Sequence, residues 1–401
     1  MTSRFDPSVL SPDPEGRSQI LSWLEAGLAA VEPERLTADA LSDHGDSPTI
    51  LIAIGKAAPA MIRGAVSVLD VVAGVCVSDH VEPVSGEISL VVGDHPIPGP
   101  ASFEAGAAVL AMVRKAPASA RIVALISGGG SALCEAPREG VPPAYLSAAT
   151  SRLIAGGADI EEINLVRSHL SAIKCGGVAR AAGRAVETLV ISDVSGADPG
   201  VVASGPTIPG EHAPEEAAGV LARYAIDLPD DVRAAMSVEP PPLPRSDLVV
   251  LADGHDAARA VAGAAPTPAA VWGEWLQGEV EACLDRFLDA AGPGVLVGAG
   301  EVVLEVRGHG AGGRNTHAAL LAASRLAGSR DVFCSFATDG VDGRSGSAGA
   351  IVDGATISRG GDPTRARDGF DSAEYLARSS DLLRCTPTGT NVSDLWILWR
   401  R

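Results

Sequence analysis

The sequence predicts an α/β protein with two domains, and three observations lead to this prediction. The chain has 401 residues, whereas single hydrophobic cores stop growing at roughly 250–300 residues. Short runs of Val, Ala, Leu and Ile alternate with segments of helical periodicity, a pattern typical of a parallel or mixed sheet with helices on both faces. A stiff proline-rich segment at 237–245 interrupts this alternation. We therefore expect domains at residues 1–240 and 241–401.

The elements of the first domain follow from apolar periodicity. A helix is expected over 15–31, followed by a buried strand at Thr49–Ile54 and a helix over 57–69. Ligands bind beyond the carboxyl ends of the strands in such sheets, so the loops after the strands are candidate sites. The remaining expected elements are strands at 74–78, 88–92, 122–127 and 186–191 and helices at 102–115, 143–156, 160–174 and 213–224.

The second domain continues the alternation after the proline-rich segment. A closing strand is expected at 394–399, where the apolar run Leu-Trp-Ile-Leu-Trp follows Asp394. The preceding elements are expected as strands at 247–252, 295–298, 302–306 and 332–337 and helices at 255–264, 278–291 and 315–327.

Composition and charge narrow the class of partner. The formal net charge of −19 argues against binding to nucleic acid or to an anionic membrane. The six cysteines are scattered without a Cys-x-x-Cys pair, which fits reduced thiols in a cytoplasm. No apolar run reaches the roughly 18 residues of a membrane span, and the first residues lack a signal-peptide core. We expect a cytoplasmic protein with small-molecule partners, for which a homodimer is an open alternative.

A glycine-rich loop follows the predicted strand 122–127. Glycines after a strand let the backbone approach a ligand and turn its N–H groups inward, which favours an anion such as a phosphate. A tight turn without a ligand is the alternative. The loop consists of Ser127, Gly128, Gly129, Gly130 and Ser131.

Lys56 follows another strand and Gly55. A lysine at the carboxyl end of a strand can act as a point charge on a transferring phosphoryl group. The alternative is a solvated lysine at the start of a helix. The frame of a Walker A motif is absent around it.

Polar side chains form a stripe along the predicted helix 160–174. Two cations and no acid lie on this stripe, so it could face an anionic substrate, or it could simply be a solvated face. The stripe consists of Asn164, Arg167, Ser171 and Lys174.

Acidic residues lie in turns after two predicted strands. Asp193 and Asp198 follow the strand 186–191, and Asp339 and Asp342 follow the strand 332–337. Carboxylates in such turns suit Mg²⁺, which prefers hard oxygen ligands and bridges to phosphates. Turns that the side chains themselves stabilise are the alternative. The first of these segments leads into a rigid turn that carries Ser204.

Gly308-His-Gly-Ala-Gly-Gly313 has the form Gly-x-Gly-x-x-Gly, with Asp331 and Asp339 downstream. This pattern is the strongest sequence support for a dinucleotide-dependent dehydrogenase. Arg314 directly follows the glycines, however, and fits better as a clamp on a phosphoryl group or a carboxylate. A hydroxyl- and amide-rich loop at 388–394 precedes the last strand. His95 fits a hydrogen-bonded loop residue better than a base.

Together these segments resemble the glycerate 2-kinase family, the type II glycerate kinases whose C-terminal part is called the MOFRL domain. Nine short stretches match in the order of the family. They are residues 55–58, 95–98, 126–131, 164–174, 191–194, 203–207, 312–315, 338–343 and 388–391.

The resemblance implies a Rossmann-like N-terminal domain, a smaller MOFRL-like C-terminal domain and an active site in the cleft between them. It implies phosphorylation of the 2-hydroxyl of D-glycerate by ATP with Mg²⁺. Lys56 and Arg314 would be the phosphoryl-transfer cations. Asp193 and Asp339 would bind metal or the substrate hydroxyl, and which does which stays open, with Asp193 counted among the catalytic residues. The other implied contacts are Ser127–Ser131, Gly312, Gly313, Asn315, Thr388 and Asn391 for the nucleotide and His95, Asn164, Arg167, Lys174 and Ser204 for the acceptor.

The chain also departs from the family pattern beside these residues, which predicts a shifted acceptor specificity. Members of the family are often labelled hydroxypyruvate reductases, so an NAD(P)H-dependent reductase using Gly308–Gly313 is one alternative function. A non-catalytic hydroxy-acid or nucleotide binder is another. The departures are Pro59, Cys175, Val178, Thr316 and His317.

Overall fold

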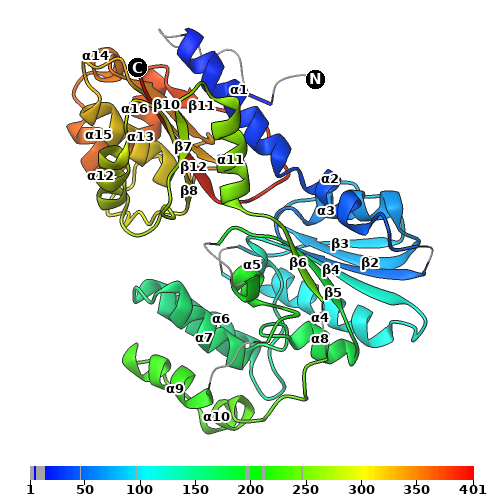
Figure 1. Cartoon of the computed structure of the whole chain (residues 1–401). Helices are drawn as coiled ribbons and strands as arrows, with labels where there is room; N and C mark the ends of the chain where they lie inside the picture. Colours follow the sequence, from blue (N-terminus) through cyan, green and yellow to red (C-terminus); the bar gives the residue numbers. More distant parts are fainter. Residues whose placement is uncertain are drawn as a thin grey trace. The chain divides into compact units, whose positions relative to one another are not determined.

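The computed structural model describes residues 4–5, 14–45, 47–95, 97–194, 199–209, 213–244 and 247–401. Asp198, residue 245 of the proline-rich segment and residue 96 of the matched stretch 95–98 lie outside these residues. The chain forms two compact units (Figure 1). The N-terminal unit comprises 33–192 and 197–251, and the C-terminal unit comprises 1–32, 193–196 and 252–401.

The N-terminal unit is built on a six-stranded sheet in the order β3-β2-β1-β4-β5-β6. β1 through β5 pair in parallel. This is the strand order of a doubly wound dinucleotide-binding sheet, so the predicted Rossmann-like class is confirmed. The strands are β1 (Thr49–Ile54), β2 (Val71–Ser78), β3 (Ile88–Val92), β4 (Arg121–Ser127), β5 (Glu187–Ile191) and β6 (Leu248–Ala252).

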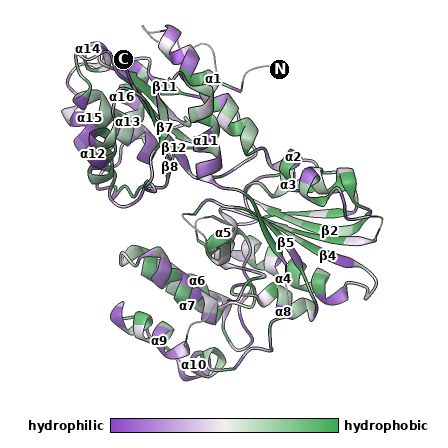
Figure 2. Ribbon diagram, viewed as in Figure 1, coloured by the Kyte–Doolittle hydropathy of each residue, from purple (hydrophilic) through white to green (hydrophobic). Residues whose placement is uncertain are grey.

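The central strands are apolar because they are covered on both faces. β1 is buried along its whole length, and β4 is buried after its first residue. In Figure 2 the strands of this sheet are coloured mostly as hydrophobic. The helices of this unit are α2 (Pro33–Leu41), α3 (Ala58–Val68), α4 (Pro100–Lys115), α5 (Gly130–Leu133), α6 (Pro143–Ala155), α7 (Ile160–Leu170), α8 (Gly177–Ala182), the 3₁₀ helix η1 (Pro199–Ser204), α9 (Pro214–Arg223) and α10 (Asp230–Met236).

The helix predicted over 160–174 is wrong at its end. α7 stops at Leu170, because Ser171 is extended with φ −105° and ψ 144°. Ser171 instead forms an isolated bridge with Pro137. Ser171 and Lys174 are therefore not on the helix that carries Asn164 and Arg167.

The C-terminal unit contains a mixed sheet in the order β11-β10-β9-β12-β8-β7. β12 runs antiparallel to both of its neighbours, β8 and β9. The strands β7, β10 and β11 were not predicted. β7 and β11, with three and two residues, are too short to show a period. The strands are β7 (Ala269–Val271), β8 (Gly294–Gly300), β9 (Val332–Ala337), β10 (Gly349–Asp353), β11 (Leu382–Leu383) and β12 (Asp394–Arg400).

The strand predicted over 302–306 is wrong. Only an isolated bridge joins Val303 to Glu279, and Val303 and Val306 are exposed. The run is apolar in sequence, but no sheet covers it, so β propensity alone did not make a strand.

Helices surround the C-terminal sheet, and one of them comes from the start of the chain. α1 (Pro14–Ala30) packs against α11 (Gly254–Ala264). No helix among the described residues is long and apolar enough to cross a membrane. The remaining helices are α12 (Val280–Ala290), α13 (Arg314–Arg325), α14 (Thr356–Gly360), α15 (Thr364–Asp368) and α16 (Ser372–Arg378).

The compact units divide the chain differently from the predicted boundary at residue 240. β6 is the sixth strand of the N-terminal sheet, which carries that unit to Leu251. Residues 1–32 belong to the C-terminal unit. Both differences arise from contacts between segments far apart in sequence, which local periodicity does not reveal.

Candidate active site

Two strand ends of the N-terminal unit are tied together at the glycine-rich loop. Gly55 follows β1 with φ +125°, and a Cβ there would lie 2.3 Å from the carbonyl oxygen of Ser127 at the end of β4. Lys56 N–H donates to the carbonyl of Gly128 at 2.9 Å. Ala57 N–H donates to Ser127 Oγ at 3.0 Å. Only glycine at position 55 permits this close approach.

The same contacts hold the stem of Lys56 against the loop. Gly129 has φ +80°, and a Cβ there would lie 3.0 Å from Lys56 Cγ and 3.3 Å from Lys56 Cε. The aliphatic chain of Lys56 therefore crosses the face of Gly129. The structure thus brings together two sites predicted separately, the strand-end lysine and the glycine-rich loop.

Ser131 at the end of the loop contacts three residues predicted to bind the acceptor, and a fourth contacts one of these three. Its Oγ lies 2.8 Å from Ser204 Oγ and accepts a hydrogen bond from Arg167 Nη1 at 2.9 Å. Its carbonyl accepts a hydrogen bond from Lys174 Nζ at 2.6 Å. Ser204 Oγ in turn donates to Asn164 Oδ1 at 2.9 Å. These residues come from α5, α7, η1 and the segment after α7.

Sequence reasoning missed the acid at the centre of this cluster. Arg167 Nη2 donates to Glu135 Oε2 at 2.9 Å, and Lys174 Nζ lies 4.0 Å from the same oxygen. Ser171 Oγ also donates to Glu135. The side chains of Glu135 and Lys174 are fully buried. Because both cations are buried and paired with an acid, the alternative of a solvated stripe is wrong.

Burial destabilises the protonated, charged form of the Lys174 side chain. Removal from water lowers the pKa of Lys174 to about 8, against the opposing attraction of Glu135. The sequence carried one signal for the acid: Glu135 comes directly after the apolar Ala132-Leu133-Cys134, where a charged residue needs a partner.

The backbone beside Ser131 is strained at three non-glycine residues. Cys175, Ala203 and Ser204 have φ values of +50°, +50° and +60°. The two strained segments are joined, because Cys175 N–H donates to the carbonyl of Ser204 at 3.0 Å. Such strain persists only where surrounding contacts enforce it, and it clusters at functional sites.

In the C-terminal unit, three strand ends meet at one edge of the sheet. Asp394 at the start of β12 pairs with Gly300 at the end of β8 and with Ala337 at the end of β9. This edge therefore carries Glu301 and Thr338 directly after their strands. It also carries the loop before Asp394.

Arg314, the first residue of α13, is anchored at this edge. Its Nε and Nη2 donate to the two carboxylate oxygens of Asp394 at 2.5 and 3.0 Å, and its Nη1 donates to Glu301 at 2.5 Å. Burial disfavours the guanidinium charge, but these carboxylates outweigh it and raise the pKa of Arg314 above its usual range. The Arg314 side chain is 32% exposed, so its charged end remains accessible to a ligand.

The predicted acid Asp193 belongs to this unit and contacts the same loop. Asn391 Nδ2 donates to Asp193 Oδ2 at 3.3 Å. Ser393, with φ +72°, donates its hydroxyl to the Asp193 carbonyl. The predicted residue Thr388 uses its hydroxyl within the loop, donating to the carbonyl of Thr338 at 2.5 Å.

The carboxylates of Asp193 and Asp339 suit Mg²⁺ as hard oxygen donors. Both are half-buried, and Asp339 Oδ1 accepts a hydrogen bond from Val341 N–H at 2.9 Å. No three His, Cys, Asp or Glu side chains gather as a metal cluster among the described residues. This donor set fits an ion that takes few protein ligands and completes its shell with water and phosphate oxygens.

The Gly-x-Gly-x-x-Gly segment is not a dinucleotide-binding turn. Asp342 accepts hydrogen bonds from Asn315 N–H at 2.9 Å and from Thr316 N–H at 2.8 Å. Its carboxylate therefore occupies the N-terminus of α13, where a pyrophosphate would bind. Burial raises the pKa of Asp342, and these donors oppose the rise. The strand expected just before the motif, 302–306, is also missing.

The predicted nucleotide contacts of this segment lie close to Asp342. A Cβ on Gly313 would lie 2.2 Å from Asp342 Oδ1. Asn315 is buried, and its Oδ1 accepts a hydrogen bond from Ser335 at 2.6 Å. The predicted acceptor residue His95 is exposed in the loop after β3.

Most departures from the family pattern have packing roles. Thr316 Oγ1 accepts from Gly313 N–H at 2.9 Å, and His317 stacks on Phe370 with ring centroids 5.4 Å apart. Pro59 is buried in the first turn of α3, and Val178 is buried in α8. These four positions are accounted for without an acceptor contact. Cys175 differs, because it takes a left-handed conformation that usually favours glycine.

Comparison with known proteins shows the family of the chain. A family model described as a domain of unknown function (DUF4147) matches residues 19–237, and the MOFRL family model matches residues 294–394. The chain is 35% identical to a D-glycerate 2-kinase of Thermotoga maritima, covering 96% of this chain and 99% of that protein. It is 33% identical to a putative hydroxypyruvate reductase of Agrobacterium vitis, with 96% and 94% covered.

A solved structure agrees with the sequence comparison. The crystal structure of a glycerate kinase from Thermotoga maritima matches with a TM-score of 0.85 and 33% identity, covering 97% of this chain and all of that one. The first family model spans more than half of the chain, and the relatives extend over nearly all of it. The chain therefore belongs to the glycerate 2-kinase family.

Proposed function

We propose that this chain is a kinase that uses ATP and Mg²⁺ to phosphorylate the 2-hydroxyl of D-glycerate or a related small hydroxy acid. One observation carries the proposal. The chain is 35% identical to a D-glycerate 2-kinase, and this similarity extends over 96% of its length.

The reaction needs charge and position rather than covalent chemistry from the protein. The 2-hydroxyl oxygen attacks the γ-phosphorus as the bond to the ADP oxygen breaks, and the hydroxyl proton passes to a base. Lys56 and Arg314 would neutralise the charge of the transferring phosphoryl group. Asp193 is our candidate for the base. The loop Ser127–Ser131 would receive phosphate oxygens on its backbone N–H groups.

Mg²⁺ would be held by Asp193, Asp339 or both, together with phosphate oxygens. When bound, it would neutralise part of the negative charge of the phosphates. Thr388 and Asn391 would contact the nucleotide, as the resemblance implies. Arg167, Lys174 and Ser204 contact Ser131 directly, and Asn164 contacts Ser204. These contacts support a role for the four residues in shaping the loop.

The alternative of an NAD(P)H-dependent reductase has less support. Its one sequence feature was the Gly308–Gly313 motif, and the carboxylate of Asp342 occupies the helix end that would bind the dinucleotide. The other alternative is a protein that binds a hydroxy acid or a nucleotide without turnover. Measured kinase activity would exclude it.

The deciding experiment measures ADP release from ATP-Mg²⁺ with a panel of hydroxy acids led by D-glycerate. ³¹P NMR of the product identifies the phosphorylated carbon. Acceptor-dependent ADP and a 2-phosphate product are the expected results. Oxidation of NADH by hydroxypyruvate without any kinase activity would replace the proposal with the reductase, and ATP binding without any product would replace it with the binder.

A further inference from the structure

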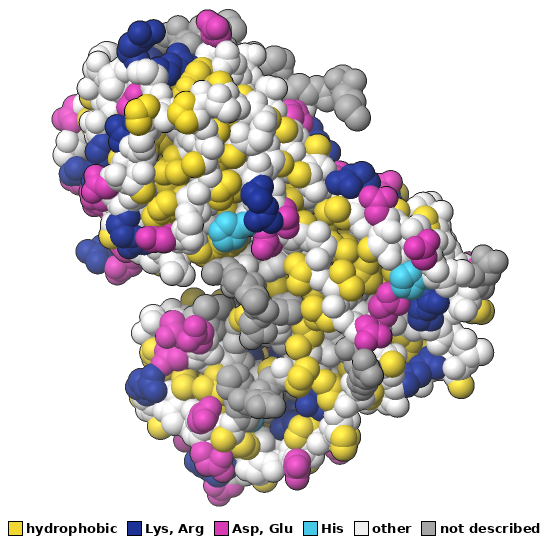
Figure 3. Space-filling view, in the orientation of Figure 1, with side chains coloured by type: hydrophobic (Ala, Val, Ile, Leu, Met, Phe, Trp, Pro, Cys, Tyr) yellow, Lys and Arg dark blue, Asp and Glu magenta, His cyan; other side chains and the backbone are white. Residues whose placement is uncertain are grey.

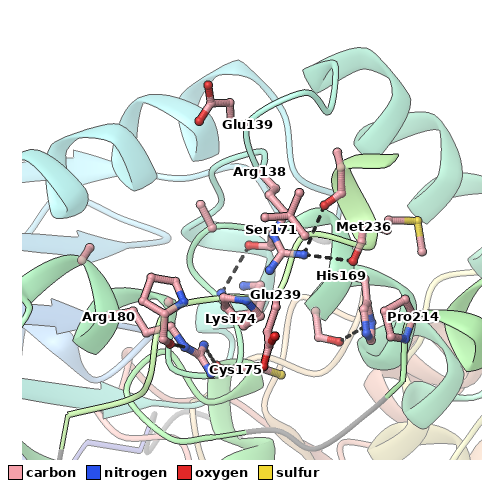
Figure 4. A pocket seen from close by; sticks show the side chains of 18 of the residues that line it. Arg138, Glu139, His169, Ser171, Lys174, Cys175, Arg180, Pro214, Met236 and Glu239 are labelled. Carbon is pink, nitrogen blue, oxygen red and sulfur yellow. Dashed lines mark hydrogen bonds between the residues drawn. The ribbon is translucent and has the colours of Figure 1, made fainter. Parts of the chain in front are cut away.

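The N-terminal unit contains a cavity of about 920 Å³. The proposed reaction assigns no ligand to this cavity. The cavity lies among the end of α7, α8, α10 and the proline-rich segment that follows α10. Figure 4 shows Arg138, Lys174 and Arg180 around it, with Glu239 from the proline-rich segment. Pockets for metabolites have volumes of roughly 300–1,000 Å³, so the cavity has room for one.

Two arginines at this cavity have no acidic partner among the described residues. Arg138 Nη1 donates to the carbonyls of Ala235 and Met236 at 3.4 and 3.3 Å. Arg180 Nε donates to the carbonyl of Pro241 at 3.0 Å, and its Nη1 donates to the carbonyl of Cys175. Neutral carbonyls bind these groups but do not neutralise their charge.

The two charges also lie close enough to repel each other. Burial, followed by repulsion from Arg180, lowers the pKa of Arg138. An anion bound by both arginines would offset their repulsion, and arginines are the side chains best shaped to bind carboxylates or phosphates through paired hydrogen bonds.

The residues that line the cavity include more basic than acidic side chains, although acidic residues outnumber basic ones in the chain as a whole. Arg114, Arg138, Lys174 and Arg180 line it together with His169, against two acids, Glu139 and Glu239. Both acids are exposed, as is Arg114, and Lys174 is paired with Glu135, so an anionic ligand would be held mainly by Arg138 and Arg180. The chain as a whole has a formal net charge of −19, and on the face drawn in Figure 3 acidic and basic side chains are interspersed. Selective placement of cations at one cavity points to an anionic ligand.

We propose that this cavity is a second ligand site, which binds a small metabolite carrying two or more negative charges on carboxylate or phosphate groups. It is linked to the glycine-rich loop through one residue. Lys174 lines the cavity and also donates to the carbonyl of Ser131. A ligand in the cavity can therefore change the position of the glycine-rich loop and so regulate the kinase activity. This regulation rests on the proposed function, whereas binding of the ligand does not.

Isothermal titration calorimetry with citrate and with inorganic phosphate tests the binding and separates the two chemistries. We expect at least one probe to bind the wild-type protein. The double variant Arg138→Met/Arg180→Met should bind it at least about 10-fold more weakly, because it loses charge-assisted hydrogen bonds. Arg152→Met is the matched control, since Arg152 also donates to a backbone carbonyl of this unit but does not line the cavity.

Glu239→Gln provides a test that leaves both arginines in place. Removing this exposed acid from the rim should tighten binding of the same probe by about two- to threefold. Lys56→Ala and Arg314→Ala should leave binding at the cavity unchanged, so the result does not depend on whether the protein is a kinase. Thermal unfolding of each variant checks that it is folded.

Three results would overturn the proposal. The first is the absence of binding for both probes at 10 mM, and the second is equal affinity of the wild type and the double variant. The third is a rise in KM for the hydroxy acid in Arg138→Met/Arg180→Met without a change in citrate or phosphate affinity, because the cavity would then belong to the reaction site.

Discussion

Arg314 takes its position from two carboxylates that lie far from it in the sequence. Its bidentate contact with Asp394 spans 80 residues, and Glu301 lies on another strand end. The sequence predicted Arg314 as an anion clamp from its place after a glycine run. It did not predict its partners, because these depend on β8 and β12 lying side by side.

Removal of either phosphoryl-transfer cation should abolish most activity without unfolding the protein. Lys56→Ala and Arg314→Ala are each expected to lower kcat by about 10²–10⁴-fold, since each removes a charge that stabilises the transition state. Steady-state ADP release with D-glycerate measures the loss. Near-normal kcat in either variant, with an unchanged melting temperature, would exclude that residue from the mechanism.

Asp394 should act as a positioning residue through Arg314. Asp394→Asn keeps the volume but weakens the bidentate pair, so we expect kcat to fall about 10-fold or more while the KM for ATP changes less. Lys in place of Arg314 should not rescue the variant, because an ammonium cannot form the two-point contact. Full activity of Asp394→Asn would show that the guanidinium needs no anchor.

At the scale of elements, the buried charges around Glu135 connect α5, α7 and the segment after α7. The sequence placed all polar members of the stripe on one helix. The structure divides them, because α7 ends at Leu170. The acid that pairs with them comes from another element, so helical periodicity could not identify it.

Lys174 predicts a pH dependence of stability. Its pKa is about 8 in the folded protein and about 10.4 in an unfolded chain. Between these values the unfolded state binds more protons, so the stability contribution of Lys174 rises with pH. The free energy of unfolding of the wild type relative to Lys174→Met should increase by about 1–3 kcal/mol from pH 7.5 to pH 10. Urea unfolding at both pH values measures it, and a constant difference would contradict the assignment.

Asp342 should stabilise the first turn of α13, because it accepts hydrogen bonds from two backbone N–H groups there. Asp342→Ala removes the acceptor for two backbone N–H groups, so it should lower the free energy of unfolding by about 1–3 kcal/mol. Asp368→Ala, at an exposed acid of the same unit, should change it by less than about 0.5 kcal/mol. Denaturant titrations followed by tryptophan fluorescence measure both, and equal effects would argue against the cap.

At the scale of the whole molecule, all five tryptophans belong to the C-terminal unit. They are Trp23, Trp272, Trp275, Trp396 and Trp399. Intrinsic fluorescence therefore follows the unfolding of that unit, whereas far-ultraviolet circular dichroism follows both units. Comparing the two signals therefore measures how much the first 32 residues contribute to the stability of the C-terminal unit.

Trp23 on α1 should stabilise a unit whose sheet begins more than 200 residues later. It is buried, and its ring contacts Trp399 at a centroid distance of 5.0 Å. Trp23→Ala should cost about 3–5 kcal/mol in the fluorescence-detected transition. Ser18→Ala, on the exposed side of the same helix, is the control. An unchanged fluorescence transition in Trp23→Ala would show that α1 does not stabilise this unit.

The sequence by itself determined the α/β class, most of the longer elements and the loops that follow the strands. It could do so because apolar periodicity and glycine turns are local properties. The glycine-rich loop, Lys56 and Arg314 were all identified in this way, by their place at the end of a strand or the start of a helix.

Only the tertiary structure decided which charges meet. Glu135 pairs with Arg167 and Lys174, Asp394 with Arg314, and Asp342 with the start of α13. Each pair joins segments that the order of strands and the packing of helices bring together. The energy of a buried charge depends on its neighbours in space, and a sequence lists only its neighbours along the chain.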